Sequence, residues 1–153
     1  MTDTQQTFED KVRTCSVNKV DDSDQSRVRK VNPGVGMPAY MKLDAFAREL
    51  RHIFPECTGV FLVGSALYSK QWRDIDIRVM LPDAEYEREF GPYPEHQPQY
   101  SSPRWNALCC ALSCWGSEMT GLPIDCQIQD TTRANDENPK VRSALGSGER
   151  LER

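Results

Sequence analysis

The sequence predicts an α/β (α+β) fold in which a small mixed β-sheet carries helices packed on one face. Apolar side chains recur at three- and four-residue intervals over 38–54 and 102–120, which is typical of amphipathic helices. Short apolar runs over 60–63 and 74–81, and alternation of apolar and polar residues over 122–129, indicate strands. With 153 residues, the chain has the size of one compact domain.

The composition excludes several classes of protein. The chain is 38% hydrophobic and 27% charged, so it is neither collagen-like, nor a coiled coil, nor disordered throughout. A net charge of -4 argues against coating duplex nucleic acid by bulk electrostatics, although it leaves room for a local basic cleft. No apolar run approaches the roughly 20 residues of a membrane helix, so we expect no membrane partner.

The cysteines point to a reducing compartment. Six of them stand at positions 15, 57, 109, 110, 114 and 126 without a C-x-x-C pair, and the chain begins with an acidic polar segment unlike a signal peptide. We therefore expect a cytoplasmic protein with free thiols. Cys110 and Cys114 have helical i,i+4 spacing, but the nearest histidine, His96, lies outside any zinc-ligand spacing, which favours packing roles over a zinc site.

Three segments of different composition define the expected domain organisation. Residues 1–33 are polar and are expected to form an N-terminal arm, with a weak hairpin near 21–24 as the alternative. Residues 34–130 hold the core domain. Residues 131–153 are expected to form a polar C-terminal tail, in which a short helix over 139–145 is the alternative.

The first half of the core domain predicts a helix and two strands. The helix over 38–54 places an apolar stripe against the sheet. The strand over 60–63 ends at Gly64-Ser65, and a short helix or turn leads to the second strand over 74–81. The stripe of the helix consists of Leu43, Phe46, Ala47, Leu50, Ile53 and Phe54.

The second half predicts a second long helix and a third strand. A charged helical segment over 82–90 and a loop over 91–101 lead to the helix over 102–120, which Ser102 caps and Gly121 ends. The predicted core face of this helix comprises Trp105, Leu108, Cys109, Leu112, Trp115 and Met119. In the strand over 122–129, the residues predicted to face the core are Ile124, Cys126 and Ile128, and those predicted to face away are Asp125, Gln127 and Gln129.

Two carboxylates, Asp74 and Asp76, alternate with isoleucines on the second predicted strand, so they project from one face. Adjacent acids repel each other unless a cation lies between them, and oxygen ligands of this kind suit Mg²⁺. Asp125 would complete a cluster of three if its strand lies beside the second. The Gly64-Ser65 turn presents N–H groups and lets phosphate oxygens approach closely. Alone, each feature also fits a solvated strand or an ordinary turn; their order and spacing favour a functional cluster of converging carboxylates.

Gly64-Ser65, followed after eight residues by Asp74-Ile75-Asp76-Ile77, resembles the signature of the nucleotidyltransferases of the polymerase-beta superfamily, in their minimal, stand-alone form. Ile124-Asp125-Cys126 is similar to the setting of that family's third acid. The resemblance covers residues 59–129 and implies a nucleotidyltransferase-like fold.

The resemblance also implies a role for each matched residue. Asp74 and Asp76 would hold two Mg²⁺ ions, and Asp125 would ligate one of them and help deprotonate the acceptor hydroxyl. Ser65, with the backbone of Gly64, would hold the β- and γ-phosphates of a nucleoside triphosphate. The basic residues expected either to contact phosphate or acceptor, or to face solvent and screen the acids, are Lys70, Arg73 and Arg78.

The implied function is the transfer of a nucleoside monophosphate from a nucleoside triphosphate to an acceptor hydroxyl, with release of pyrophosphate. The acceptor would be an RNA end such as that of tRNA, a protein side chain or a small molecule. The residues after Asp125 are too few for the helical domain that larger members append. The acceptor site would therefore come from the loop over 91–101, the arms, a second subunit of a homo-oligomer or another partner.

Two other functions stay open from the sequence. One is a catalytically idle nucleotidyltransferase-like fold that serves as a binding or regulatory module, antitoxin-like or inhibitor-like. The other is a different metal-dependent phosphotransferase or phosphodiesterase that uses the same acids.

Overall fold

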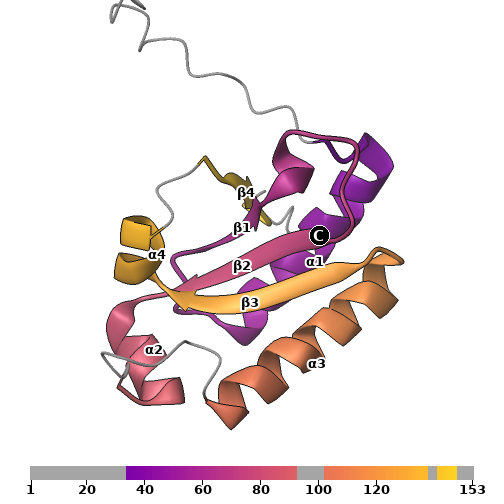
Figure 1. Ribbon diagram of the computed structural model, residues 1–153. Helices are drawn as coiled ribbons and strands as arrows, with labels where there is room; N and C mark the ends of the chain where they lie inside the picture. The colour runs from indigo at the N-terminus through magenta and orange to yellow at the C-terminus, as the bar shows by residue number, and fades with distance from the viewer. Residues whose placement is uncertain (1–33, 93–101, 138–140, 148–153) are drawn as a thin grey trace, which may run out of the picture. The chain divides into compact units, whose positions relative to one another are not determined.

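The computed structural model describes residues 34–92, 102–137 and 141–147 (Figure 1). The chain divides into two compact units, residues 1–30 and 31–153, and every described residue belongs to the second. The predicted arm over 1–33, with its alternative hairpin, and most of the predicted 91–101 loop lie outside the described residues.

The second unit contains a mixed sheet, as the sequence predicts, and this sheet has four strands where the sequence predicts three. Its strands are β1 (Gly59–Val63), β2 (Ile75–Leu81), β3 (Ile124–Asp130) and β4 (Ser143–Leu145), in the order β3-β2-β1-β4 (Figure 1). Strands β2 and β3 are parallel, whereas β1 runs antiparallel to both β2 and β4. Strand β2 is therefore central, with a neighbour on each side.

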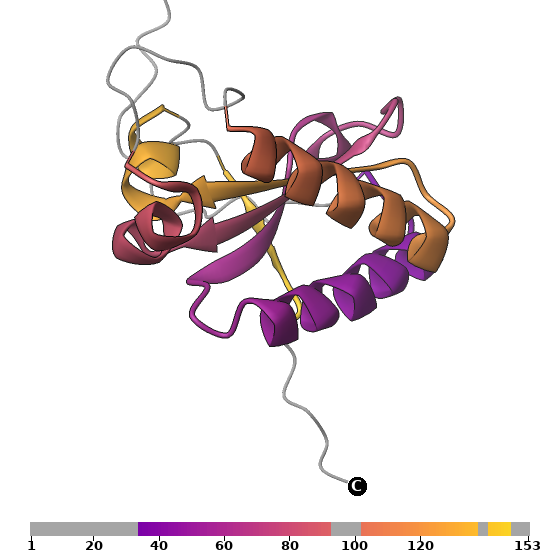
Figure 2. The same cartoon turned by 90° about the horizontal axis from the view of Figure 1, so that it is seen from below.

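The two long helices, α1 (Met37–Ile53) and α3 (Pro103–Thr120), cover one face of this sheet. Figure 2 shows α1 below the sheet and α3 running along β3. The alternate residues of β2 and β3 that face the helices are buried, and these are Ile75, Ile77, Val79, Ile124, Cys126 and Ile128. The other face keeps the polar residues of both strands, which confirms the predicted alternation.

Two short helices follow the parallel strands at one end of the sheet. Helix α2 (Asp83–Phe90) begins directly after β2, and α4 (Thr131–Glu137) begins directly after β3. Because parallel strands end at the same edge, both helices lie at that edge (Figure 1). None of the helices in the described part of the chain is both long and apolar enough to span a membrane.

Helix α3 has the predicted caps but a different buried stripe. The Ser102 side chain accepts a hydrogen bond from Trp105 N, and Gly121 ends the helix in the left-handed conformation. Trp115 and Met119 are 38% and 42% exposed, so their predicted place in the core is wrong. The buried stripe consists of Trp105, Cys109, Leu112, Gly116 and Thr120.

The reason for this difference is the close approach of α1 at Gly116. A Cβ at this position would lie 2.7 Å from Cζ of Phe46, so the two helices can meet here only because residue 116 has no side chain. Trp115 is displaced to the rim, where its ring makes an edge-on contact with Phe46. On α1, Leu43, Phe46, Ala47 and Leu50 are buried as predicted, whereas Ile53 is 51% exposed at the helix end.

The end of the chain departs from the predicted tail over 131–153. Helix α4 and strand β4 lie within it, and β4 pairs with β1 where a short helix over 139–145 was the sequence-based alternative. Leu145 is fully buried, and Gly146 N donates a hydrogen bond of 2.7 Å to Asp44 Oδ1 on α1. Strand β4 pairs with the backbone N–H and C=O groups at the open edge of β1. This pairing joins segments far apart in the chain, so the three residues of β4 do not predict it by themselves.

Native-state thiol labelling should separate the cysteines by burial. Cys110 and Cys114 are exposed, whereas burial raises the pKa of the Cys109 thiol to about 11 and raises the pKa of Cys126 as well. Because the thiolate is the reactive form, iodoacetamide at about pH 8 should modify the exposed pair at least about tenfold faster. Peptide mass mapping measures the rates, and urea should abolish the difference. Fast modification of Cys109 in the folded protein would contradict this packing of α3.

Candidate functional site

The open face of the sheet brings two of the predicted acids side by side. Asp76 of β2 and Asp125 of β3 are direct partners in the parallel ladder. Both side chains point away from the helices, and their exposed fractions are 22% and 37%. The second and third strands are therefore adjacent, which was the condition for Asp125 to join the other acids, and the predicted outward direction of Asp125 is confirmed.

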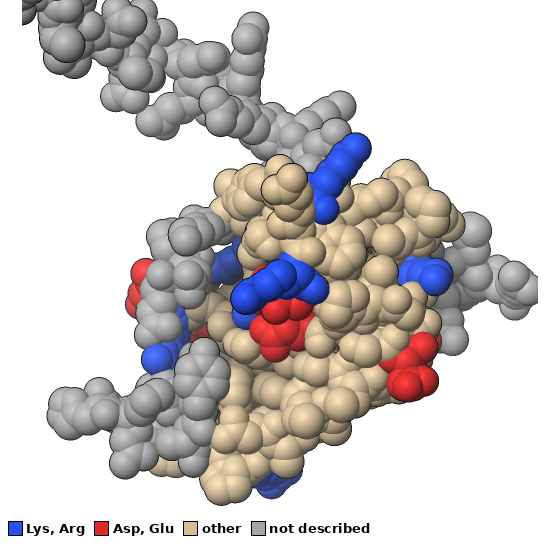
Figure 3. All heavy atoms as spheres, turned by 45° about the vertical axis from the view of Figure 1, so that its right-hand side comes forward, with Lys and Arg blue, Asp and Glu red and all other residues tan. Residues whose placement is uncertain are grey.

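Arg78 lies between these two carboxylates. Its Nη2 donates to Asp76 Oδ1 at 3.1 Å and its Nη1 donates to Asp125 Oδ2 at 3.5 Å. The guanidinium is only 14% exposed and also donates to the main-chain oxygens of Ile77 and Asp125. Figure 3 shows basic and acidic atoms in contact near the centre of the visible face. Residue parity predicted this placement, and the single positive charge of the arginine offsets part of the charge of the acid pair.

Asp74, the first acid of the motif, stands outside the strand. Strand β2 begins at Ile75, whose N–H donates to Pro123 O at 2.8 Å, so the prediction of a strand from Asp74 is wrong by one residue. The ladder stops here because Pro123 has no N–H to continue it and Asp76 already faces the last residue of β1, Val63. Within the described part of the chain, no three carboxylate, thiol or imidazole side chains are grouped closely enough to hold a metal ion.

The pKa of Asp76 is set by its burial and by the charged side chains around it. Burial raises the pKa of the Asp76 carboxyl above its usual range, and Arg78 opposes that effect. The carboxylates of Asp125 and Asp74 raise the pKa further, so Asp74 acts on Asp76 through space although it lies before the strand. A cation close to Asp76 would stabilise its charged form.

Gly64 closes one side of the acid cluster. Its backbone has φ 73° and ψ -158°, a conformation essentially confined to glycine. A Cβ at this position would overlap Asp76 Oδ2, so the Asp76 carboxylate rests directly against the backbone of Gly64. Ser65 is exposed and starts the short 3-10 helix η1 (Ser65–Leu67), whose first turn accepts hydrogen bonds from Tyr68 N and Ser69 N.

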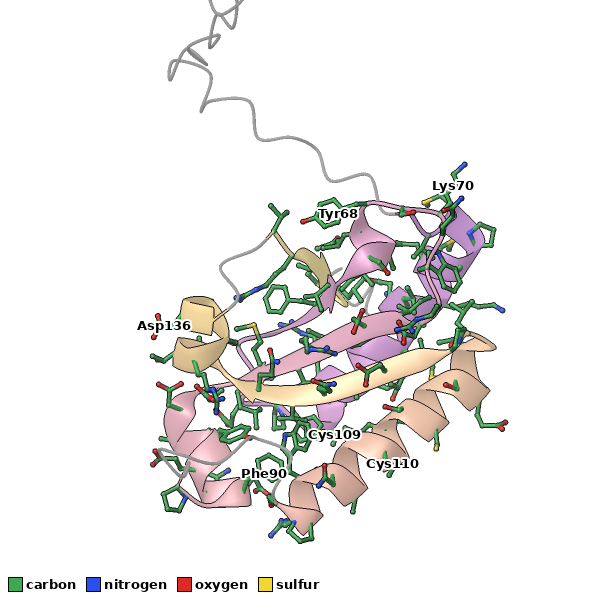
Figure 4. All side chains as sticks on the ribbon, in the orientation of Figure 1. Tyr68, Lys70, Phe90, Cys109, Cys110 and Asp136 are labelled. Carbon is green, nitrogen blue, oxygen red and sulfur yellow. The ribbon has the colours of Figure 1, made fainter. Side chains whose placement is uncertain are left out.

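A cavity of about 500 Å³ opens beside these residues. Four residues predicted for the site line it, namely Gly64, Ser65, Asp76 and Arg78. Asp125 does not line it, but it contacts the lining residue Arg78. Lys70 and Arg73 are exposed and do not line the cavity, and Figure 4 shows Lys70 pointing away from the sheet. A cavity of this size matches the range of small-ligand sites.

The structure adds Arg142 and Gln127 to the cavity lining, neither of which was a predicted site residue. Arg142, just before β4, donates to Met80 Sδ at 3.1 Å and to Ala134 O at 2.9 Å, and its guanidinium lies 5.9 Å from the ring centroid of Phe61. Gln127 donates to Asp125 Oδ2 at 3.0 Å, and Tyr68 is 65% exposed at the cavity rim. Parity with Asp125 placed Gln127 on this face, whereas nothing local marks Arg142 because the pairing of β4 brings it here.

Comparisons with protein-family models, with curated proteins and with solved structures give no match for this chain. The cavity joins an acid pair with a bridging guanidinium, a second guanidinium, a hydroxyl and a glycine backbone turn. Carboxylates suit a hard cation, and the remaining groups suit phosphate oxygens.

Proposed function

We propose that the chain is a metal-dependent nucleotidyltransferase that moves a nucleoside monophosphate from a nucleoside triphosphate to an acceptor hydroxyl. The observation that carries the proposal is the in-register pair of Asp76 and Asp125 beside the Gly64 turn, at the edge of a cavity of about 500 Å³. The order of the turn, the acid on β2 and the acid on β3 is that of the polymerase-beta superfamily signature, which supports this reaction class.

The acid pair suits one Mg²⁺ ion. Mg²⁺ is usually held by one or two carboxylates, with water and substrate phosphates as its other ligands, and Asp76 and Asp125 supply the two carboxylates. The position of Arg78 between them indicates that positive charge is favoured there. A second ion would need Asp74 as a further ligand, and Asp74, Asp76 and Asp125 are not grouped closely enough to hold a metal ion together. Bound metal would supply Lewis acidity that neutralises charge on the triphosphate.

Side chains and backbone groups of the chain bind the triphosphate and accept the proton of the acceptor. The Gly64-Ser65 turn and the Ser65 hydroxyl bind phosphate oxygens, and Arg78 and Arg142, which also line the cavity, offset their charge. The acceptor oxygen attacks the α-phosphorus, its proton passes to Asp125, and the bond to the β-phosphate breaks so that pyrophosphate leaves. Rate enhancement then comes from positioning and charge neutralisation.

The acceptor of the nucleotide is a hydroxyl group whose carrier belongs to one of three classes. An RNA end such as that of tRNA, a protein hydroxyl or a small molecule would approach across the open face of the sheet, which no described long helix covers. The described cysteines are all free, which supports a cytoplasmic enzyme.

The direct test incubates the full chain with Mg²⁺ and each α-labelled nucleoside triphosphate, with and without bulk tRNA. Asp76→Asn and Asp125→Asn should each reduce label transfer at least about a hundredfold, because the metal contributes several kcal/mol of charge stabilisation. Glu49→Gln, an exposed acid on α1, is the matched control and should leave transfer unchanged. Release of nucleoside monophosphate without transfer would instead assign a phosphodiesterase-type activity.

One observation favours a second candidate, a catalytically idle binding or regulatory module. Arg78 already satisfies both acids, so the fold needs no metal to hold them together. Absence of turnover, together with nucleotide binding that does not depend on Mg²⁺, would support this module and exclude the enzyme.

A further inference from the structure

The outward side of α3 has a composition that is unusual for a surface helix. Of its 18 residues, only Arg104 and Glu118 are charged, and they stand near opposite ends. Surface helices normally carry polar and charged side chains on the face opposite the core. In Figure 3, where the right-hand side of Figure 1 is turned forward, the lower part of the visible face is broadly uncharged, with charged atoms at its margins. Figure 4 shows Cys110 on this side and Cys109 on the sheet side.

Arg104 and Glu118 lie along the same side of α3. Fourteen residues of helix advance about 21 Å and return to within about 40° of the starting direction, so Arg104 and Glu118 share one face. Ala111 lies midway between them. We define this outer face by its exposed residues, which are Arg104, Ala107, Ala111, Cys114, Trp115 and Glu118.

Both charges oppose the dipole of their own helix. Arg104 lies in the first turn, where the helix end is positive, and Glu118 lies in the last turn, where it is negative. Arg104 makes an exposed ion pair of 2.9 Å with Glu89, a kind of contact that contributes little to stability. Beside a second helix that runs in the opposite direction, each of these charges would lie near the end of the partner helix that favours it.

We propose that the outer face of α3 is the interface of a homodimer in which two α3 helices pack antiparallel about a two-fold axis at Ala111. In that arrangement, Arg104 of each copy faces Glu118 of the other and lies beside the negative end of the partner helix. The side chain of Trp115 packs over the small Ala107 across the axis. Alanine on the axis lets the helices approach to about 8 Å.

The test is sedimentation equilibrium of the full chain under reducing conditions. The wild type should be a dimer, and Ala111→Glu, which places two carboxylates together on the axis, should weaken association at least about a hundredfold. Glu118→Arg should weaken it about tenfold because arginines then face each other, and the double change Arg104→Glu with Glu118→Arg should restore it to within about threefold. Ala144→Glu, exposed on β4 at the far edge of the sheet from β3, is the control and should have no effect.

A second measurement locates the axis. In a Cys110→Ser, Cys114→Ser background, Ala111→Cys should form an intermolecular disulfide on mild oxidation, because two Cβ atoms at the axis lie about 4 Å apart; Ala144→Cys should not. A monomer at every concentration overturns the proposal, and so does a dimer that Ala111→Glu leaves intact. If the Ala111→Cys variant is a monomer and its thiol at residue 111 resists chemical modification, something other than a second copy covers the outer face of α3. That result also overturns the homodimer.

Discussion

Replacing Gly64 with alanine should lower the free energy of unfolding by about 3 kcal/mol and abolish the proposed nucleotidyl transfer. Two effects combine at this position. The backbone, with φ 73° and ψ -158°, has a conformation that L-residues rarely adopt, and the added Cβ would overlap Asp76 Oδ2. The chain can relieve the overlap only by moving the acid that the proposed reaction needs. Urea denaturation followed by circular dichroism measures the loss.

Gly36 provides the matched control for this substitution. It precedes α1 with φ -62° and ψ 157°, and a Cβ there would meet no atom within 4 Å. Gly36 is the N-cap of α1, where alanine is less favourable than glycine, so Gly36→Ala should lower the free energy of unfolding by no more than about 1 kcal/mol. If Gly64→Ala were equally mild and kept full activity, the Asp76 carboxylate would not rest against the Gly64 backbone, and the described site would be wrong.

Replacing Arg78 with glutamine should lower the free energy of unfolding by about 2 kcal/mol at neutral pH, because it leaves two part-buried carboxylates without their shared cation. Millimolar Mg²⁺ should raise the melting temperature of the variant more than that of the wild type if Asp76 and Asp125 bind metal. Differential scanning calorimetry with and without Mg²⁺ measures both effects.

The pH dependence of this loss has a defined sign. The pKa of Asp76 is raised in the folded state above its ordinary value of 3.8, so its contribution to stability is greatest below that value and is lost as the pH rises through the folded pKa. Without Arg78 the pKa rises further, so the difference between variant and wild type should shrink as the pH falls toward about 4. Arg48→Gln, which removes an exposed i,i+4 pair with Asp44, should cost no more than about 0.5 kcal/mol. An equal loss in both variants would contradict the special role of Arg78.

Local patterns were sufficient for most of the fold. Alternation placed Ile124, Cys126 and Ile128 in the core, and the Ser102 cap and Gly121 set the ends of α3. These predictions succeeded because each depends on residues within a few positions of one another. The adjacency of Asp76 and Asp125 is of another kind, since it needs β2 and β3 to pair across the whole of α3.

The misses share a physical cause, which is dependence on contacts distant in sequence. Strand β4 forms because β1 offers an open edge, and its pairing carries Arg142 to the cavity. Asp74 is excluded from β2 because the neighbouring β3 begins after Pro123. Trp115 is displaced from the core by the approach of Phe46 to Gly116. None of these contacts produces a periodic pattern of apolar residues in the segment concerned, so local sequence does not predict it.

The pairing of β2 with β3 also determines which changes of sequence length keep Asp76 and Asp125 side by side. The two acids are separated by the strand spacing of about 4.8 Å, which hydrogen bonds fix whatever the connecting segment contains. Insertions or deletions between residues 90 and 102 would leave that separation unchanged, because they fall outside the ladder. A slip of the ladder by one residue would instead put Cys126 beside Asp76 and turn Asp125 toward α3. Variation in length is thus tolerated around this site, whereas variation in register is not.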